Sequence, residues 1–243
     1  MISNCRPPRS VKSYTTREGR LTRGQRNAIE TLFPVYGLDT SGYEVEKIDF
    51  SREFGREADT VLEIGFGDGE ALLQMARENP QNNFLGIEVH RPGLGHLLLQ
   101  VKSLALDNIR VVREDAVEFI ANAVMDSSLE RICLFFPDPW PKKKHHKRRI
   151  LHQPFIALCT EKLKPGGLFH FATDWQDYAE KALLNFDDAP GLVNLAGAGC
   201  YSPRPKQRPL TKFEKRGIRL GHGVWDIIMQ KPRQDQAEKQ SNL

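Results

Sequence analysis

The chain has 243 residues, of which 40% are hydrophobic, and it carries a formal net charge of +4. This length and apolar content suit one α/β domain with a substantial core. No apolar run is long enough to span a membrane, and the first residues lack the apolar segment of a secretion signal. We therefore expect a soluble cytoplasmic protein. The four cysteines lie far apart without metal-ligand spacing, so we expect neither a disulfide framework nor a metal site.

The two ends of the chain differ from its middle. Residues 1–33 are rich in arginine and poor in large apolar side chains, which predicts a flexible basic arm. Such an arm either contacts RNA or is an ordinary disordered terminus. Residues 34–59 suggest an irregular lead-in with short helical pieces. The expected domain spans residues 34–231, and residues 232–243 form a polar tail.

A regular alternation of strands and helices begins at residue 60. The expected strands are 60–64, 83–89, 109–113, 132–136, 168–172, 191–196 and 224–230. The expected helices are 70–78, 90–106, 116–125, 148–163 and 175–186. This alternation predicts an α/β fold with a doubly wound, mainly parallel, seven-stranded sheet.

A glycine-rich turn follows the first expected strand. Its glycines are Gly65, Gly67 and Gly69, and their spacing differs from the G-x-G-x-x-G of a pyrophosphate-binding turn. Glu63 precedes the turn by two residues. A carboxylate there disfavours a pyrophosphate and favours a cationic or amine-bearing ligand.

Two further acids follow the next two strands. Glu88 stands where a carboxylate accepts hydrogen bonds from ribose hydroxyls, and Asp115 stands where an adenine amino group would be read. The alternative for each acid is a helix N-cap or a surface charge. The series resembles the class I S-adenosylmethionine-dependent methyltransferases, which implies a Rossmann-like fold and S-adenosyl-L-methionine as cofactor. By that resemblance Glu63 faces the methionine end, Glu88 the ribose and Asp115 the adenine.

The segment after the fourth strand combines a rigid acid, an aromatic plate and a basic run. In residues 136–141 (FPDPWP), Asp138 lies between two prolines that stiffen the turn, and Trp140 offers a flat face for stacking. Residues 142–149 contain six Lys/Arg and two His. A solvated face or a localisation signal is the alternative. The position at the carboxyl edge of an α/β sheet favours base and phosphate binding.

Residues 136–145 are similar to the tRNA (guanine-N7-)-methyltransferase family of the bacterial single-chain type. Segments 63–69, 172–174 and 211–214 agree with it. The resemblance implies a tRNA partner, guanosine 46 of the variable loop as target, no obligatory protein partner and a monomer. It implies cofactor contacts from Glu63, Gly65, Gly67, Gly69, Glu88, Asp115 and Asp138, with Asp138 catalytic. It implies substrate contacts from Lys142, Asp174, Thr211, Lys212, Phe213 and Glu214. It implies RNA contacts from Lys144, His145, His146, Lys147, Arg148 and Arg149.

Methylation at guanine N7 needs positioning more than proton transfer, because N7 already carries an in-plane lone pair. Asp138 is expected to orient the base, and the nearby lysines are expected to keep it ionised. Residues 204–219 suggest a second basic loop. The alternatives are a methyltransferase of another RNA or of a small molecule, a nicotinamide oxidoreductase and a non-catalytic RNA-binding protein. The basic segments disfavour a small substrate, and Glu63 with the glycine spacing disfavours a nicotinamide cofactor.

Overall fold

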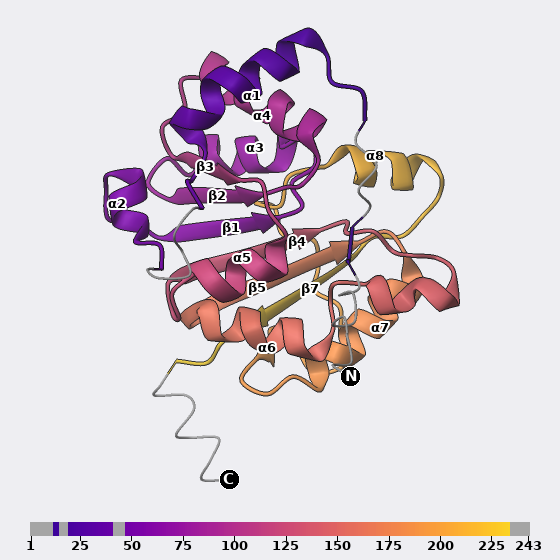
Figure 1. Cartoon of the computed structure of the whole chain (residues 1–243). Helices are drawn as coiled ribbons and strands as arrows, with labels where there is room; N and C mark the ends of the chain where they lie inside the picture. The colour runs from indigo at the N-terminus through magenta and orange to yellow at the C-terminus, as the bar shows by residue number, and fades with distance from the viewer. Residues whose placement is uncertain (1–11, 15–18, 41–46, 234–243) are drawn as a thin grey trace, which may run out of the picture.

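A seven-stranded sheet forms the centre of the computed structural model, which describes residues 12–14, 19–40 and 47–233 (Figure 1). Its order is β3-β2-β1-β4-β5-β7-β6. Strands β1 to β5 pair in parallel, whereas β7 runs antiparallel to β5 and β6 antiparallel to β7. The strands are β1 Thr60–Ile64, β2 Asn83–Ile87, β3 Ile109–Val112, β4 Leu129–Phe135, β5 Leu163–Thr173, β6 Val193–Asn194 and β7 Trp225–Gln230. The predicted doubly wound, mainly parallel sheet is confirmed.

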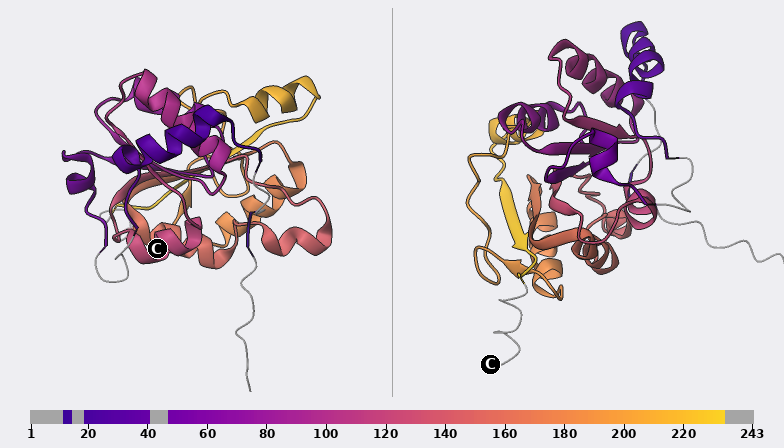
Figure 2. Two further views of the ribbon diagram at one scale, coloured as in Figure 1. Left: turned by 45° about the horizontal axis from the view of Figure 1, so that its top comes forward. Right: turned by 90° about the vertical axis from the view of Figure 1, so that its left-hand side faces the viewer.

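Helices cover both faces of the sheet (Figures 1 and 2). They are α1 Arg23–Tyr36, α2 Phe50–Phe54, α3 Glu70–Glu78, α4 Arg91–Ser103, α5 Ala116–Ala123, the 3-10 helix η1 Lys143–Arg148, α6 Gln153–Lys162, α7 Gln176–Asp187 and α8 Lys212–Arg219. Helices α1, α3 and α4 lie on one face, and α5, α6 and α7 on the other. Among the residues that the structure describes, no helix combines the length and apolarity needed to cross a bilayer.

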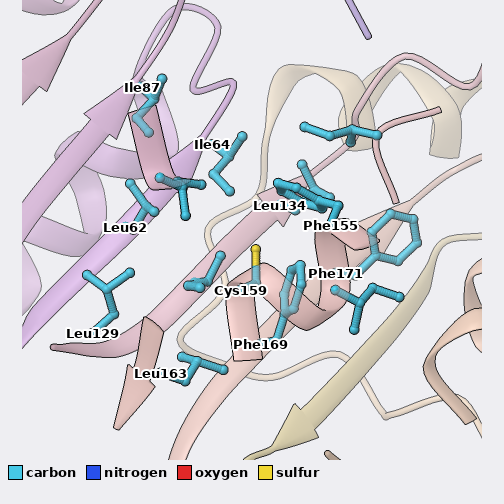
Figure 3. Close-up of a cluster of buried hydrophobic side chains, with 14 of the residues drawn as sticks. Leu62, Ile64, Ile87, Leu129, Leu134, Phe155, Cys159, Leu163, Phe169 and Phe171 are labelled. Carbon is cyan, nitrogen blue, oxygen red and sulfur yellow. The ribbon is translucent and has the colours of Figure 1, made fainter. Parts of the chain in front are cut away.

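Alternate side chains of each strand enter cores on opposite faces of the sheet. On β1, Leu62 and Ile64 pack toward α5, α6 and α7, whereas Val61 packs toward α1, α3 and α4. Figure 3 shows the first of these cores, where Phe155 of α6 meets Phe169 of β5. Truncating side chains buried in this way costs about 2 to 5 kcal/mol. The two cores therefore hold the carboxyl ends of the strands in fixed positions.

Helix α1 lies within the stretch for which a flexible arm was expected. Thr22 caps it, since its hydroxyl accepts from Gln25 N while the Gln25 side chain accepts from Thr22 N. Ala28 and Leu32 are buried in the core shared with α4, and the arginines of α1 point outward. The arm therefore does not extend to residue 33. Residues 1–11 and 15–18 of the expected arm, and 234–243 of the expected tail, lie outside the described residues.

Helix α8 replaces part of the basic loop expected at residues 204–219. Thr211 is its N-cap, and its hydroxyl accepts from Glu214 N at 3.2 Å. Thr211 and Glu214 stand in the T-x-x-E spacing of a capping box, a signal that the charge pattern had masked. Figure 1 shows α8 beyond the carboxyl ends of the parallel strands.

Candidate cofactor and RNA site

A cavity of about 230 Å³ opens at the carboxyl ends of β1, β2 and β4. Ligands of open α/β sheets bind at this edge, where the strand order reverses. Apolar side chains from the strand ends form much of its wall. The predicted site residues that line it are Gly65, Gly67, Glu88 and Asp138. Residues far apart in the chain thus meet as the motif analysis predicted.

The glycine turn needs residues without a side chain. Gly65, Gly67 and Gly69 have φ of +70°, +59° and +80°, in the left-handed region that favours glycine. Gly93 of α4, which the sequence motifs did not indicate, also has no room for a side chain. A Cβ on Gly93 would lie 2.0 Å from the carbonyl oxygen of Gly67. Helix α4 therefore packs directly against the backbone of Gly67, a residue that lines the cavity.

Glu63 is a buried acid without a hydrogen-bond partner at Oε2. The residue is 3% exposed and lines a small cavity beside the main one, together with Gly65, Phe136, Thr211 and Lys212. Burial, assisted by the charge of Glu88, raises the pKa of Glu63 to about 8. An unpaired buried carboxyl is costly, and a bound ammonium group would satisfy it. This environment fits the amino group at the methionine end of S-adenosylmethionine.

Glu88 lies just beyond the end of β2, and backbone donors fix its carboxylate. Its Oε2 accepts from Gly67 N at 2.9 Å and its Oε1 accepts from His90 N at 2.8 Å. Each carboxylate oxygen can accept a second hydrogen bond. Glu88 is thus preorganised at the cavity wall for two neighbouring hydroxyl donors, as a ribose presents.

Asp115 caps the N-terminus of helix α5. Its Oδ1 accepts from Val117 N at 2.9 Å and from Glu118 N at 3.5 Å, which makes Asp115 the N-cap of α5. This geometry is the alternative considered for each acid. Glu114 and Ala116, its chain neighbours, line the main cavity. The adenine contact of Asp115 stays a prediction.

Asp138 faces the cavity from a strained turn. Phe136 and Trp140 on either side have φ of +50° and +46°, which non-glycine residues adopt at a cost of about 1 to 3 kcal/mol each. Burial raises the pKa of Asp138, and the positive charge of Arg148 only partly opposes this effect. No lysine is among the groups that shift this pKa, so the expectation that nearby lysines keep Asp138 ionised stays a prediction.

Trp140 has one face already covered. The Arg148 guanidinium carbon lies 3.8 Å from the indole centroid. Trp140 Nε1 donates to Ser13 O at 3.1 Å, and Arg148 donates to Lys12 O at 3.1 Å and to Tyr14 O at 2.9 Å. Ser13 and Tyr14 also line the main cavity. An N-terminal segment that sequence reasoning did not assign to the site thus forms part of its wall.

The basic run divides into exposed and buried cations. Lys142, Lys144 and Lys147 are exposed, and His145 and His146 are half-buried. Arg149, by contrast, is 5% exposed. Its Nε donates to Pro139 O at 2.9 Å, its guanidinium pairs with Asp177, and it lies 4.7 Å from the Tyr178 ring centroid. Arg149 therefore supports the loop from beneath, which corrects its assignment as an RNA contact.

Helix α8 approaches the end of β5 and the glycine turn. A Cβ on Gly217 would lie 3.1 Å from Asp174 Oδ2, so the helix lies directly against this acid. His222 Nδ1 is 3.9 Å from the same oxygen. At the other end of α8, Lys212 pairs with Asp68 of the glycine turn. Phe213 belongs to α8, and its side chain is outside the described part of the structure.

Glu214 points into the protein, although a substrate contact was expected. Its carboxylate accepts from Arg208 Nη1 at 2.6 Å, from Arg208 Nη2 at 2.8 Å and from Arg204 Nε at 2.9 Å. These bonds occupy it within the protein. In this geometry Glu214 anchors α8, while Thr211 and Lys212 of the same turn line the small cavity.

Together, these residues suit one kind of ligand and one kind of substrate. The glycine turn, Glu63 and Glu88 form an edge that suits an amine-bearing nucleoside. Asp138 and Asp174 add acids at the ends of β4 and β5. The 3-10 helix η1, which follows the Asp138 turn, carries exposed lysines, and α8, whose Lys212 lines the small cavity, carries further exposed cations, so a polyanion at this edge would meet positive charge.

Known proteins that are similar to this chain are methyltransferases. A family model described as "Putative methyltransferase" matches residues 57–227. A tRNA (guanine-N(7)-)-methyltransferase of Shewanella amazonensis is 54% identical over 223 residues, which is 92% of each chain. The enzyme of the same name from Alcanivorax borkumensis is 52% identical over the same shares.

Solved structures support the fold. The crystal structure of the 16S rRNA methyltransferase KamB is 17% identical, with a TM-score of 0.56 over 77% of this chain and 95% of that one. That of the aminoglycoside resistance methyltransferase NpmB1 is 15% identical, with a TM-score of 0.53 over 74% of this chain and 91% of that one. The sequence relatives, which are 52 to 54% identical over 92% of the chain, show that the chain belongs to the tRNA (guanine-N(7)-)-methyltransferase family.

Proposed function

We propose that the protein transfers a methyl group from S-adenosyl-L-methionine to N7 of a guanosine in tRNA, forming 7-methylguanosine. Guanosine 46 of the variable loop is the target that the family resemblance implies. One observation carries the proposal: the glycine turn, Glu63, Glu88 and Asp138 meet at one sheet edge in a chain 54% identical to an enzyme of that name.

Residues of both cavities would hold the cofactor. Glu63 would pair with its ammonium group, and Glu88 would accept hydrogen bonds from its ribose hydroxyls. The glycine turn lets the backbone approach the ligand closely. S-adenosylmethionine, when bound, supplies an electrophilic methyl group on a sulfonium.

The acids beside the cofactor orient the base. A carboxylate at Asp138 or Asp174 accepts hydrogen bonds from guanine N1–H and the 2-amino group, which turns N7 toward the methyl group. It also stabilises the positive charge that the methylated ring keeps. Asp138 must be ionised for this role. Neither acid needs to remove a proton from N7, because its lone pair is free to react.

The tRNA is held on both sides of the opening. The candidate phosphate contacts are exposed cations: Lys142 just before η1, Lys144 and Lys147 within it, and Lys215 and Arg219 on α8. A stacked guanosine must leave its helix to reach the cavity. We propose that the protein acts as a monomer without an obligatory protein partner. A tRNA substrate is consistent with a cytoplasmic location.

The test is methyl transfer from S-adenosylmethionine labelled in its methyl group to an unmodified tRNA transcript, followed by nucleoside analysis. The control transcript carries adenosine at position 46. The proposal expects labelled 7-methylguanosine from the first transcript and none from the second. A different methylated nucleoside would overturn the base assignment, and absence of both transfer and cofactor binding would favour the non-catalytic RNA binder.

A further inference from the structure

Arg208 is a buried cation outside the residues assigned to the site. Its side chain is 0% exposed and lies between two carboxylates, Glu214 and Asp226, that are each 2% exposed. The two Nη atoms donate to Glu214 at 2.6 and 2.8 Å, and Nη2 also donates to Asp226 Oδ2 at 3.1 Å. Nε lies 2.7 Å from Asp226 Oδ1. The planar guanidinium therefore bridges both acids with fixed geometry.

One of the two acids is anchored in the sheet. Asp226 belongs to β7, where it pairs in register with Ala172 of β5. His170 Nε2 of β5 lies 2.7 Å from Asp226 Oδ1. Burial lowers the pKa of His170, so a neutral ring leaves Arg208 as the buried cation between the carboxylates. This side of the bridge cannot move without disturbing the β5–β7 pair.

The other acid is part of the helix that covers the site. Glu214 lies in the first turn of α8, beside Thr211 and Lys212, which line the small cavity that holds Glu63. The Arg208 guanidinium carbon is also 5.6 Å from the ring centroid of Phe136, which lines both cavities. One side chain thus connects the sheet, the first turn of α8 and the residue at the start of the Asp138 turn.

We propose that Arg208 is a positioning residue for methyl transfer. By bridging Asp226 and Glu214 it holds the first turn of α8 over the methionine end of the cofactor pocket. The inference rests on the proposed function and adds a residue to it. Stability alone does not account for the arrangement, because well-packed apolar residues in place of a buried ion cluster are often at least as stable.

The decisive variant neutralises the whole bridge. Arg208→Met alone leaves two buried carboxylates uncompensated and endangers folding, so it is combined with Glu214→Gln and Asp226→Asn. Arg204→Gln is the matched control, since Arg204 also donates to Glu214 but its side chain is 39% exposed. Arg208→Lys is a second variant that keeps the charge but cannot reach both acids as a fork. The readouts are the cofactor Kd, kcat and KM for tRNA, and amide hydrogen exchange of α8 and of β4.

The triple variant should melt like the wild type, bind the cofactor several-fold more weakly and lose about 100-fold in kcat. Its α8 amides should exchange faster while those of β4 stay protected. Arg208→Lys should show the same pattern more mildly, and Arg204→Gln should stay within about threefold of the wild type. Wild-type cofactor Kd and α8 protection in Arg208→Lys, or in a folded triple variant, would overturn the proposal.

These readouts separate the inference from the proposed function. If the wild type forms no 7-methylguanosine, the proposed function fails, while cofactor Kd and α8 exchange still report whether Arg208 holds the helix.

Discussion

Replacing Glu63 by Gln tests the assignment of the cofactor's amino group. Burial raises the pKa of Glu63 to about 8 from its ordinary value of 4.5. A carboxyl with a raised pKa in the folded state is favoured in its protonated form. The contribution of Glu63 to folding stability is therefore fully present below pH 4.5 and is lost as the pH rises toward 8. A shift of this size lowers the free energy of unfolding by about 5 kcal/mol above pH 8 and by about 3 kcal/mol at pH 7. The Gln variant without cofactor should thus be more stable than the wild type at pH 7.

Cofactor binding should show the opposite preference. An ammonium group binds the ionised carboxylate, so binding must release the proton of Glu63. With a pKa of about 8, the ionised fraction of Glu63 rises about 25-fold between pH 6.5 and 8.5. We expect the cofactor Kd of the wild type to tighten over the part of this range in which the ligand's ammonium group stays protonated, and the Kd of Glu63→Gln to be weaker and to lack this increment.

Titration calorimetry in two buffers of different ionisation enthalpy measures both Kd and proton release. Glu78→Gln is the matched control, because Glu78 is an exposed acid at the end of α3, the helix that follows the glycine turn. It should reproduce the wild-type pH dependence. The same Kd and the same pH dependence in the wild type and in Glu63→Gln would refute the assignment.

Three further predictions concern the rest of the site. Asp138→Ala should lower methyl transfer by at least about 100-fold with an unchanged melting temperature, and because burial raises the pKa of Asp138, wild-type kcat should fall on acidification at a higher pH than for an ordinary aspartate. Normal turnover in that variant would remove its role. Replacing Lys142, Lys143 and Lys144 by Ala should weaken tRNA binding and reduce its salt slope by about two to three; an unchanged slope would take this run out of the interface. Gly93→Ala should impair both folding stability and cofactor affinity, since its Cβ would lie 2.0 Å from a backbone oxygen; a wild-type melting curve and Kd would contradict that view.

Features set by local chain order were predictable. The strands of the sheet follow from short apolar runs, and the glycine turn follows from three glycines that all adopt positive φ. Glu63 and Glu88 come to the same edge because parallel strands place their carboxyl ends together. Predicting where α8 begins required only the T-x-x-E spacing at Thr211, but the density of positive charge suggested a loop instead.

Features set by long-range contacts were not predictable. Arg148 and Arg149 are adjacent in sequence, yet Arg148 lies over an indole at the surface and Arg149 is buried against Tyr178. The sequence of the basic run does not show which arginine is buried, because the position of each side chain depends on residues far away in the chain. The same is true of Arg208, whose two acids come from α8 and β7. The N-terminal residues at the cavity wall carry no motif that would have placed them there.

The most direct test of the central claim replaces one atom of the substrate. A tRNA in which the target guanosine is 7-deazaguanosine has a C–H group where N7 and its lone pair would be. The account predicts methyl transfer to the guanosine-containing tRNA and none to the deaza form, although both should bind with similar affinity. Equal methylation of the two tRNAs would show that another atom is the acceptor and would contradict transfer to N7.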